Sequence, residues 1–161
     1  MSGCPVDPEA RLALGVRPAR PEDAAECVRL RGLTRENAVP EARLRQYGIT
    51  VDSWAADIAR GALCGWVAAR GGQMLGYCFG AVSTGEVVVL AILPPAEGRG
   101  LGRRLLTRVT DELHRLGHRR LFLGTSADPA LRAHGFYRRL GWRGTGRIDA
   151  RGDEVLEWCL P

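Results

Sequence analysis

The sequence of 161 residues contains no lysine, so all 23 of its cationic side chains are arginines. This absence excludes lysine Schiff-base catalysis and the phosphate-binding lysine of a Walker loop. No apolar run approaches the roughly 18 residues of a membrane span, and residues 1–10 lack the basic-then-apolar order of a signal peptide. The five cysteines form no CxxC pair, which argues against a disulfide framework or a zinc site. We therefore expect a cytoplasmic protein with reduced thiols that binds neither a metal nor a membrane.

The remaining composition is that of an ordinary globular domain. Hydrophobic residues make up 45% of the sequence and charged residues 25%, close to the average for soluble domains. A chain of this length buries enough surface to form a core without disulfides or metals. We expect a single domain over residues 1–161, in which residues 1–11 form a flexible arm.

The charge is distributed unevenly along the chain. Residues 1–98 hold 10 arginines against 11 acidic residues, whereas residues 99–151 hold 13 arginines and 4 acidic residues. Such a basic second half would attract an anionic ligand or a nucleic acid. No known nucleic-acid-binding motif occurs there and aromatic residues are sparse, so we expect no nucleic-acid partner and keep a basic binding module as an alternative.

Hydrophobic patterning predicts strands and helices in alternation. The predicted strands are residues 12–17, 64–69, 74–82, 86–93, 121–123, 142–147 and 155–160. The predicted helices are a segment that begins at Pro21 and residues 52–59, 101–116 and 129–140. Residues 33–50 show no clear pattern. The strand patterns at both ends of the chain form hairpins, so we expect an α/β fold with a mixed sheet.

A glycine-rich loop, EGRGLGR at residues 97–103, joins the strand 86–93 to the N-terminus of the following helix. Free backbone N–H groups and the helix dipole at such a junction favour a bound phosphate. A Rossmann loop would need glycine at Arg103, and a Walker loop would need lysine. Gly100 and Gly102 instead meet the Q/R-x-x-G-x-G/A pattern of acetyl-CoA enzymes. A glycine turn without a ligand is the alternative for this loop taken alone.

Two stretches together resemble the signatures of the GNAT superfamily of N-acetyltransferases. They are EVVVLAILPPAEGRGLGRRLL at residues 86–106 and AHGFYRRLGW at residues 133–142, and the resemblance covers most of residues 17–160. It implies a mixed, largely antiparallel central sheet that is flanked by helices and splayed at its central strands. It also implies a bacterial enzyme that transfers the acetyl group of acetyl-CoA to a primary amine in a ternary complex without a metal. A homodimer is compatible with the resemblance.

The resemblance also implies roles for individual residues. Tyr137 would be the general acid that protonates the leaving thiolate, and Glu86 would be the general base. Backbone groups of the central strand would contact the pantetheine arm, at Leu90, Ala91 and Ile92. The loop would surround the pyrophosphate with Glu97, Gly98, Arg99, Gly100, Leu101, Gly102 and Arg103.

Two positions depart from the family pattern. Glu97 stands where the family prefers Gln or Arg, and an acid beside a pyrophosphate weakens its binding unless the side chain points away. Ala130 stands where many members carry an asparagine that binds the pantetheine region. These departures keep open a catalytically silent member that binds coenzyme A as a sensor.

The amine acceptor is left open by the sequence, and polyamines, amino acids, aminoglycosides and peptide α-amines are all compatible with it. In the family, the variable segment between the first strand and the hairpin determines the acceptor. We expect four of its residues to matter for acceptor choice: Glu36, Glu41, Tyr47 and Trp54. Packing in the core is the alternative for Trp54.

Overall fold

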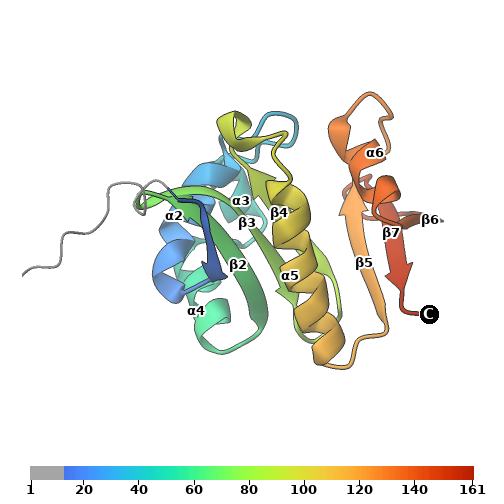
Figure 1. Ribbon diagram of the computed structural model, residues 1–161, viewed down its shortest axis with the longest axis horizontal. Helices are drawn as coiled ribbons and strands as arrows, with labels where there is room; N and C mark the ends of the chain where they lie inside the picture. Colours follow the sequence, from blue (N-terminus) through green and yellow to red (C-terminus); the bar gives the residue numbers. More distant parts are fainter. Residues whose placement is uncertain (1–12) are drawn as a thin grey trace, which may run out of the picture.

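The computed structural model describes residues 13–161, so the arm predicted for residues 1–11 and the first residue of the predicted strand 12–17 lie outside the described residues. The strands form two sheets (Figure 1). The first has the order β1-β2-β3-β4 and consists of β1 (Gly15–Pro18), β2 (Leu63–Arg70), β3 (Gln73–Ala81) and β4 (Val87–Ile92). The second has the order β5-β7-β6 and consists of β5 (Arg120–Thr125), β6 (Arg143–Ile148) and β7 (Glu154–Cys159).

The helices of the described residues lie close to the predicted positions, except for one helix within the segment 33–50. They are α2 (Ala24–Arg31), α3 (Glu41–Gln46), α4 (Val51–Ala59), α5 (Leu101–Arg115) and α6 (Arg132–Arg139), with short 3₁₀ turns η1 (Pro21–Asp23) and η2 (Pro94–Ala96). The segment 33–50, which shows no clear pattern, contains α3. The helix predicted for residues 129–140 begins later, because an N–H···O bond from Ala130 to the Asp128 carboxylate (2.9 Å) holds a turn before it.

One backbone bridge joins the two sheets in the part of the chain that the structure describes. Glu86 forms an isolated parallel bridge to Phe122, and the Phe122 N–H donates to the Gly85 carbonyl at 3.3 Å. All other paired strands are antiparallel. Beyond the bridge β4 and β5 diverge, which confirms the prediction of a mixed, largely antiparallel sheet that is splayed at its centre.

Helices cover both faces of the first sheet. Helix α5 packs on β2, β3 and β4 (Figure 1) through Leu105, Val109 and Leu113, which recur every four residues and are fully buried. Helices α2 and α4 pack on the opposite face. There Trp54 makes edge-to-face contacts with Tyr77 and Phe79, with ring centroids 5.6 and 5.4 Å apart. These layers hold β4 rigidly at the edge where the sheet splays.

Gly65 of β2 lies opposite Phe79 of β3, and the Phe79 ring occupies the space that a side chain at residue 65 would need. A Cβ at Gly65 would lie 2.2 Å from two carbons of this ring. We expect Gly65→Ala to lower the free energy of unfolding by about 1–3 kcal/mol, because overpacking displaces the ring. Gly15→Ala in β1 is the matched control, since its Cβ would meet only a carbonyl oxygen at 4.0 Å. Urea unfolding of both variants checks this, and equal stabilities would contradict it.

Candidate active site

A cavity of about 610 Å³ opens where β4 and β5 diverge. Its walls come from β4, the loop before α5, the end of β5, helix α6 and the segment 31–37. This volume is typical of a site for a small molecule. The splay of the sheet therefore creates the site, because strands that were paired throughout would close it.

The glycine loop forms one end of the cavity. Gly98 and Gly100 adopt φ values of +77° and +76°, a left-handed conformation that favours glycine. The Arg104 N–H is the first to bond within the helix, donating to the Gly100 carbonyl at 3.1 Å. The four N–H groups from Gly100 to Arg103 donate to no acceptor in the part of the chain that the structure describes. These groups and the positive end of the 15-residue helix α5 suit a bound anion.

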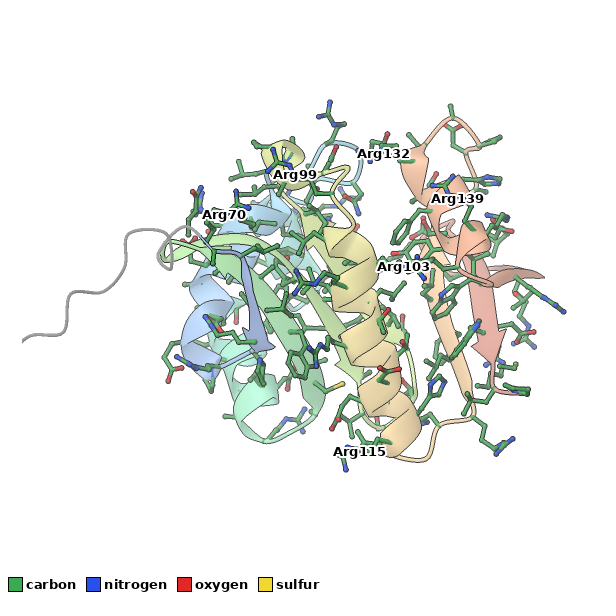
Figure 2. All side chains as sticks on the ribbon, in the orientation of Figure 1. Arg70, Arg99, Arg103, Arg115, Arg132 and Arg139 are labelled. Carbon is green, nitrogen blue, oxygen red and sulfur yellow. The ribbon has the colours of Figure 1, made fainter. Side chains whose placement is uncertain are left out.

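Arginine side chains surround this end of the cavity. Figure 2 shows Arg103, Arg132 and Arg139 where the two halves of the molecule face each other, and Arg99 on the loop before α5. Three of them line the cavity, whereas Arg99 is exposed outside it. Their charges add to the field of the helix terminus and favour a ligand that carries several negative charges.

Strand β4 presents unpaired backbone groups to the cavity. A bulge leaves Val88 unpaired, since Phe79 pairs with Val89 and the next residue pairs with Val87. The Leu93 N–H donates to β3, at the Leu75 carbonyl (2.9 Å).

Because antiparallel pairing alternates along a strand, the backbone N–H groups of Leu90 and Ile92 point away from β3, toward the cavity. Leu90 and Ile92 also line the cavity, whereas the buried Ala91 faces the core on the side of α2.

Tyr137 lines the cavity from helix α6. Its ring makes edge-to-face contacts with Phe136 (5.0 Å) and Trp142 (6.1 Å), and its hydroxyl bonds to no other described residue. Burial raises the pKa of Tyr137, so the phenol is protonated at neutral pH. The side chain can therefore donate a proton or a hydrogen bond into the cavity.

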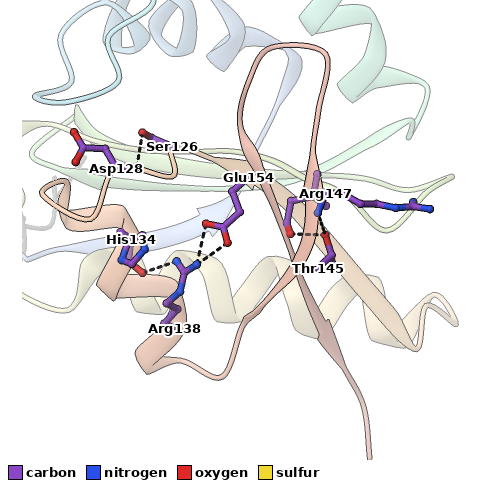
Figure 3. Close-up of polar contacts among 8 residues, drawn as sticks. Ser126, Asp128, His134, Arg138, Thr145, Arg147 and Glu154 are labelled. Atoms are coloured by element: carbon purple, nitrogen blue, oxygen red, sulfur yellow. Dashed lines mark hydrogen bonds and ion pairs between the residues drawn. The ribbon is translucent and has the colours of Figure 1, made fainter.

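Helix α6 is held in place by one of its own residues, Arg138, which follows Tyr137 in the sequence. One guanidinium nitrogen donates to both oxygens of Glu154 in β7, at 2.7 and 2.8 Å (Figure 3). A second nitrogen donates to the His134 carbonyl at 3.1 Å. These contacts fix the orientation of the turn that carries Tyr137.

Comparison with known proteins identifies the family of this arrangement. The model of the Acetyltransferase (GNAT) family matches residues 28–142. The protein belongs to the GNAT acetyltransferase family. An IAA acetyltransferase of Azospirillum brasilense is 35% identical over 94 residues, which cover 56% of this chain and 61% of that protein. The match thus spans about three fifths of the length of this curated relative.

Solved acetyltransferase structures share the fold over nearly the whole chain. The N-acetyltransferase of Staphylococcus aureus Mu50 superimposes with a TM-score of 0.73 at 18% identity and covers 92% of this chain and 99% of its own. YncA of Salmonella typhimurium, solved with acetyl-CoA, has a TM-score of 0.70 at 20% identity, with 92% and 95% covered. PaiA of Thermoplasma acidophilum, solved with coenzyme A, has a TM-score of 0.69 at 14% identity, with 92% and 99% covered.

Glu97, which departs from the GNAT pattern, is engaged in ion pairs. Its Oε2 accepts from Arg35 Nε at 3.0 Å and also pairs with Arg132. These partners lie 62 and 35 residues away in the sequence, so no local pattern indicates them. Glu36 also reaches across the cavity and accepts a bond from the Arg132 backbone N–H at 2.9 Å. The loop after α2 therefore bridges both walls, and two arginines compensate the charge of Glu97.

Glu86 itself forms the bridge between the sheets and does not line the cavity. Burial raises the pKa of its carboxyl, Arg151 opposes this shift, and Asp149 adds to it. The structure therefore places the GNAT general-base candidate next to the hairpin between β6 and β7. From there its carboxylate can act on the cavity only through water.

Three residues that the sequence did not indicate also line the cavity: Arg31, Thr34 and Asp153. The Thr34 hydroxyl is buried without a hydrogen-bond partner among the described residues. No motif signals these residues, because they come from a helix end, a loop and a hairpin that only the fold brings together. Of the four acceptor candidates named from the sequence, Glu36 lines the cavity, whereas Trp54 packs in the core.

The described residues contain no group of three or more His, Cys, Asp or Glu side chains arranged to hold a metal ion. None of the helices in residues 13–161 has the length and apolar character that crossing a bilayer requires.

Proposed function

We propose that this protein transfers the acetyl group of acetyl-CoA to a primary amine by direct attack in a ternary complex. The observation that carries the proposal is that two sets of hydrogen-bond donors, both without acceptors among the described residues, line the same cavity. They are the free N–H groups from Gly100 to Arg103 and the hydroxyl of Tyr137. Family membership and two structural neighbours solved with coenzyme A or acetyl-CoA support it.

The residues present fit this cosubstrate. The free N–H groups of the glycine loop, with Arg103 and Arg132 nearby, would hold the diphosphate. The outward-facing N–H groups of Leu90 and Ile92 would pair with the amides of the pantetheine arm, as a sheet edge pairs with a peptide. Acetyl-CoA supplies the thioester that the amine attacks.

The chain's own groups then serve the transfer. The cavity holds the amine beside the thioester, and such positioning supplies much of the rate. An N–H of β4, at Leu90 or Ile92, would donate to the acetyl oxygen as negative charge develops there. The Tyr137 hydroxyl would donate its proton to the departing sulfur, and Glu86 would accept the ammonium proton through water.

Replacing Glu86 by Gln tests the general base. A base must be ionised to act, so kcat/KM should fall as the pH falls through the Glu86 pKa, which burial raises above its ordinary value. We expect Glu86→Gln to lower kcat/KM at pH 7 by about 100-fold and to remove this acidic limb from the pH profile. Glu26→Gln on the exposed face of α2 is the matched control. A pH profile that does not change in Glu86→Gln would remove Glu86 from this role.

Two measurements test the proposed function itself. Calorimetry with coenzyme A should show saturable binding, and thiol release from acetyl-CoA should depend on an added amine. Binding without release for any amine would favour the silent sensor. No binding of coenzyme A, together with RNA binding that falls steeply with salt, would favour the basic binding module.

A further inference from the structure

Two opposite charges, Arg31 and Asp153, line the cavity that Tyr137 also lines, and neither forms an ion pair among the described residues. Arg31, at the end of α2, lines the cavity and forms no ion pair within residues 13–161; its guanidinium bonds only to the Asn37 carbonyl. Asp153, just before β7, also lines the cavity, and its carboxylate accepts no hydrogen bond from the described residues. Both side chains are partly buried.

The hairpin between β6 and β7 aims Asp153 at the cavity. Asp149 is occupied locally, since its Oδ1 accepts from the N–H groups of Arg151 (2.9 Å) and Asp153 (3.0 Å). This turn lies against Gly124 of β5, where a Cβ would meet Asp149 Oδ2 at 2.6 Å and Asp153 Cβ at 3.5 Å. The close approach therefore fixes the hairpin at the cavity wall while the Asp153 carboxylate stays free.

A third polar group in the same cavity lacks a partner. Thr34 is 8% exposed, and its hydroxyl has no hydrogen-bond partner among the described residues. Buried polar groups are nearly always satisfied, and buried charges are nearly always paired. Burial lowers the pKa of Arg31, whereas Tyr77, Tyr137 and Asp153 oppose this shift and Arg151 adds to it. One buried hydroxyl without a partner and two opposite charges without an ion pair, all in one cavity, indicate a ligand that satisfies them.

We infer that the acceptor is a small zwitterion, a free amino acid whose carboxylate binds Arg31 and whose amino group binds Asp153. This inference rests on the proposed function and specifies its substrate class. A polyamine would place a cation against Arg31, which would repel it. A purely anionic ligand would be repelled by the Asp153 carboxylate. Only a molecule with both charges pairs with both side chains, and the Thr34 hydroxyl can donate to its carboxylate.

Thiol release from acetyl-CoA tests the inference with matched acceptors. The panel contains free amino acids, the amide of each, the amine that lacks the carboxylate, and dipeptides. We expect free amino acids to give the highest kcat/KM, at least tenfold above their amides. We expect Arg31→Gln to lower kcat/KM for the preferred amino acid by about 10- to 100-fold and to leave its amide unaffected, so that the discrimination is lost. The dipeptides test whether the site prefers a free amino acid or a peptide, whose carboxylate lies farther from its amino group.

Two further variants separate binding from structure. Arg29→Gln on the same helix is the control, because Arg29 is exposed and pairs with Glu26 at 2.9 Å outside the cavity; it should act like the wild type. Asp153→Asn should raise KM for the amino acid even if Arg31→Gln does not fold. The inference is overturned if amides or simple amines match the amino acids, if dipeptides exceed them, or if Arg31→Gln slows acid and amide equally. It is also overturned if no member of the panel is acetylated although coenzyme A binds, whereas absent coenzyme A binding overturns the proposed function instead.

Discussion

Replacing Tyr137 by Phe is expected to lower kcat by about 100- to 10,000-fold, the usual contribution of a general acid. The phenol lines the cavity, and burial raises its pKa, so it holds its proton at neutral pH. Phenylalanine keeps the ring contacts with Phe136 and Trp142. The dissociation constant of coenzyme A should therefore change little, and steady-state thiol release with calorimetry will separate the two effects.

Tyr77→Phe is the matched control for this experiment. The Tyr77 hydroxyl is buried and donates to the Cys27 carbonyl at 2.9 Å, away from the cavity. Its loss should cost about 1 kcal/mol of stability and leave kcat unchanged. Full turnover in Tyr137→Phe would show that the thiolate leaves without this acid, and Tyr137 would then be a packing residue.

Those parts of the fold that rest on local patterns could be predicted from the sequence. Helix α5 was predicted within one residue, because its leucines and valine recur at helical spacing and all face the sheet. The hairpin at residues 70–73 was also predicted, because its two glycines are typical of a tight turn. In the structure, Gly71 and Gly72 adopt the positive φ values that a two-residue turn needs. The prediction that β4 and β5 splay apart came from the family resemblance, because no residue pattern in either strand specifies it.

Helix α3 could not be predicted because its sequence carries almost no pattern. Only Leu44 of this helix is buried, so the hydrophobic period that signals a helix has a single member. Contacts with α2 stabilise it instead. The prediction for Trp54 was ambiguous for a related reason, since its place between Tyr77 and Phe79 depends on residues more than twenty positions away.

The candidate site also has one part that a local sequence pattern indicates and one part that only the fold brings together. The glycine loop is continuous in sequence, so its pattern shows where an anion would bind. The ion pairs of Glu97 join distant segments, and the free charges of Arg31 and Asp153 share a cavity only after the hairpin folds against β5. The sequence therefore indicates the glycine loop, where we propose that the cosubstrate binds, far better than it indicates Arg31 and Asp153, where we propose that the acceptor binds.

A negative charge in the glycine loop should greatly reduce the affinity for coenzyme A. Gly100 has a φ of +76° and open space where its side chain would lie, and aspartate tolerates this conformation better than most residues. Two like charges about 4 Å apart near a protein surface repel by about 4 kcal/mol before salt screens them. We therefore expect Gly100→Asp to raise the dissociation constant of coenzyme A on the order of 100-fold, as measured by calorimetry.

Gly61→Asp separates the charge from the backbone cost. Gly61 follows α4 with a φ of +74° and equally open surroundings, and it does not line the cavity. Both variants introduce the same side chain at a glycine with positive φ and open surroundings, so they share the backbone cost of the substitution. Only Gly100→Asp places the carboxylate where the four free N–H groups converge, so only this variant should lose affinity. If both variants bound coenzyme A as tightly as the wild type does, the diphosphate would have to bind elsewhere, and the glycine loop would be a turn without a ligand.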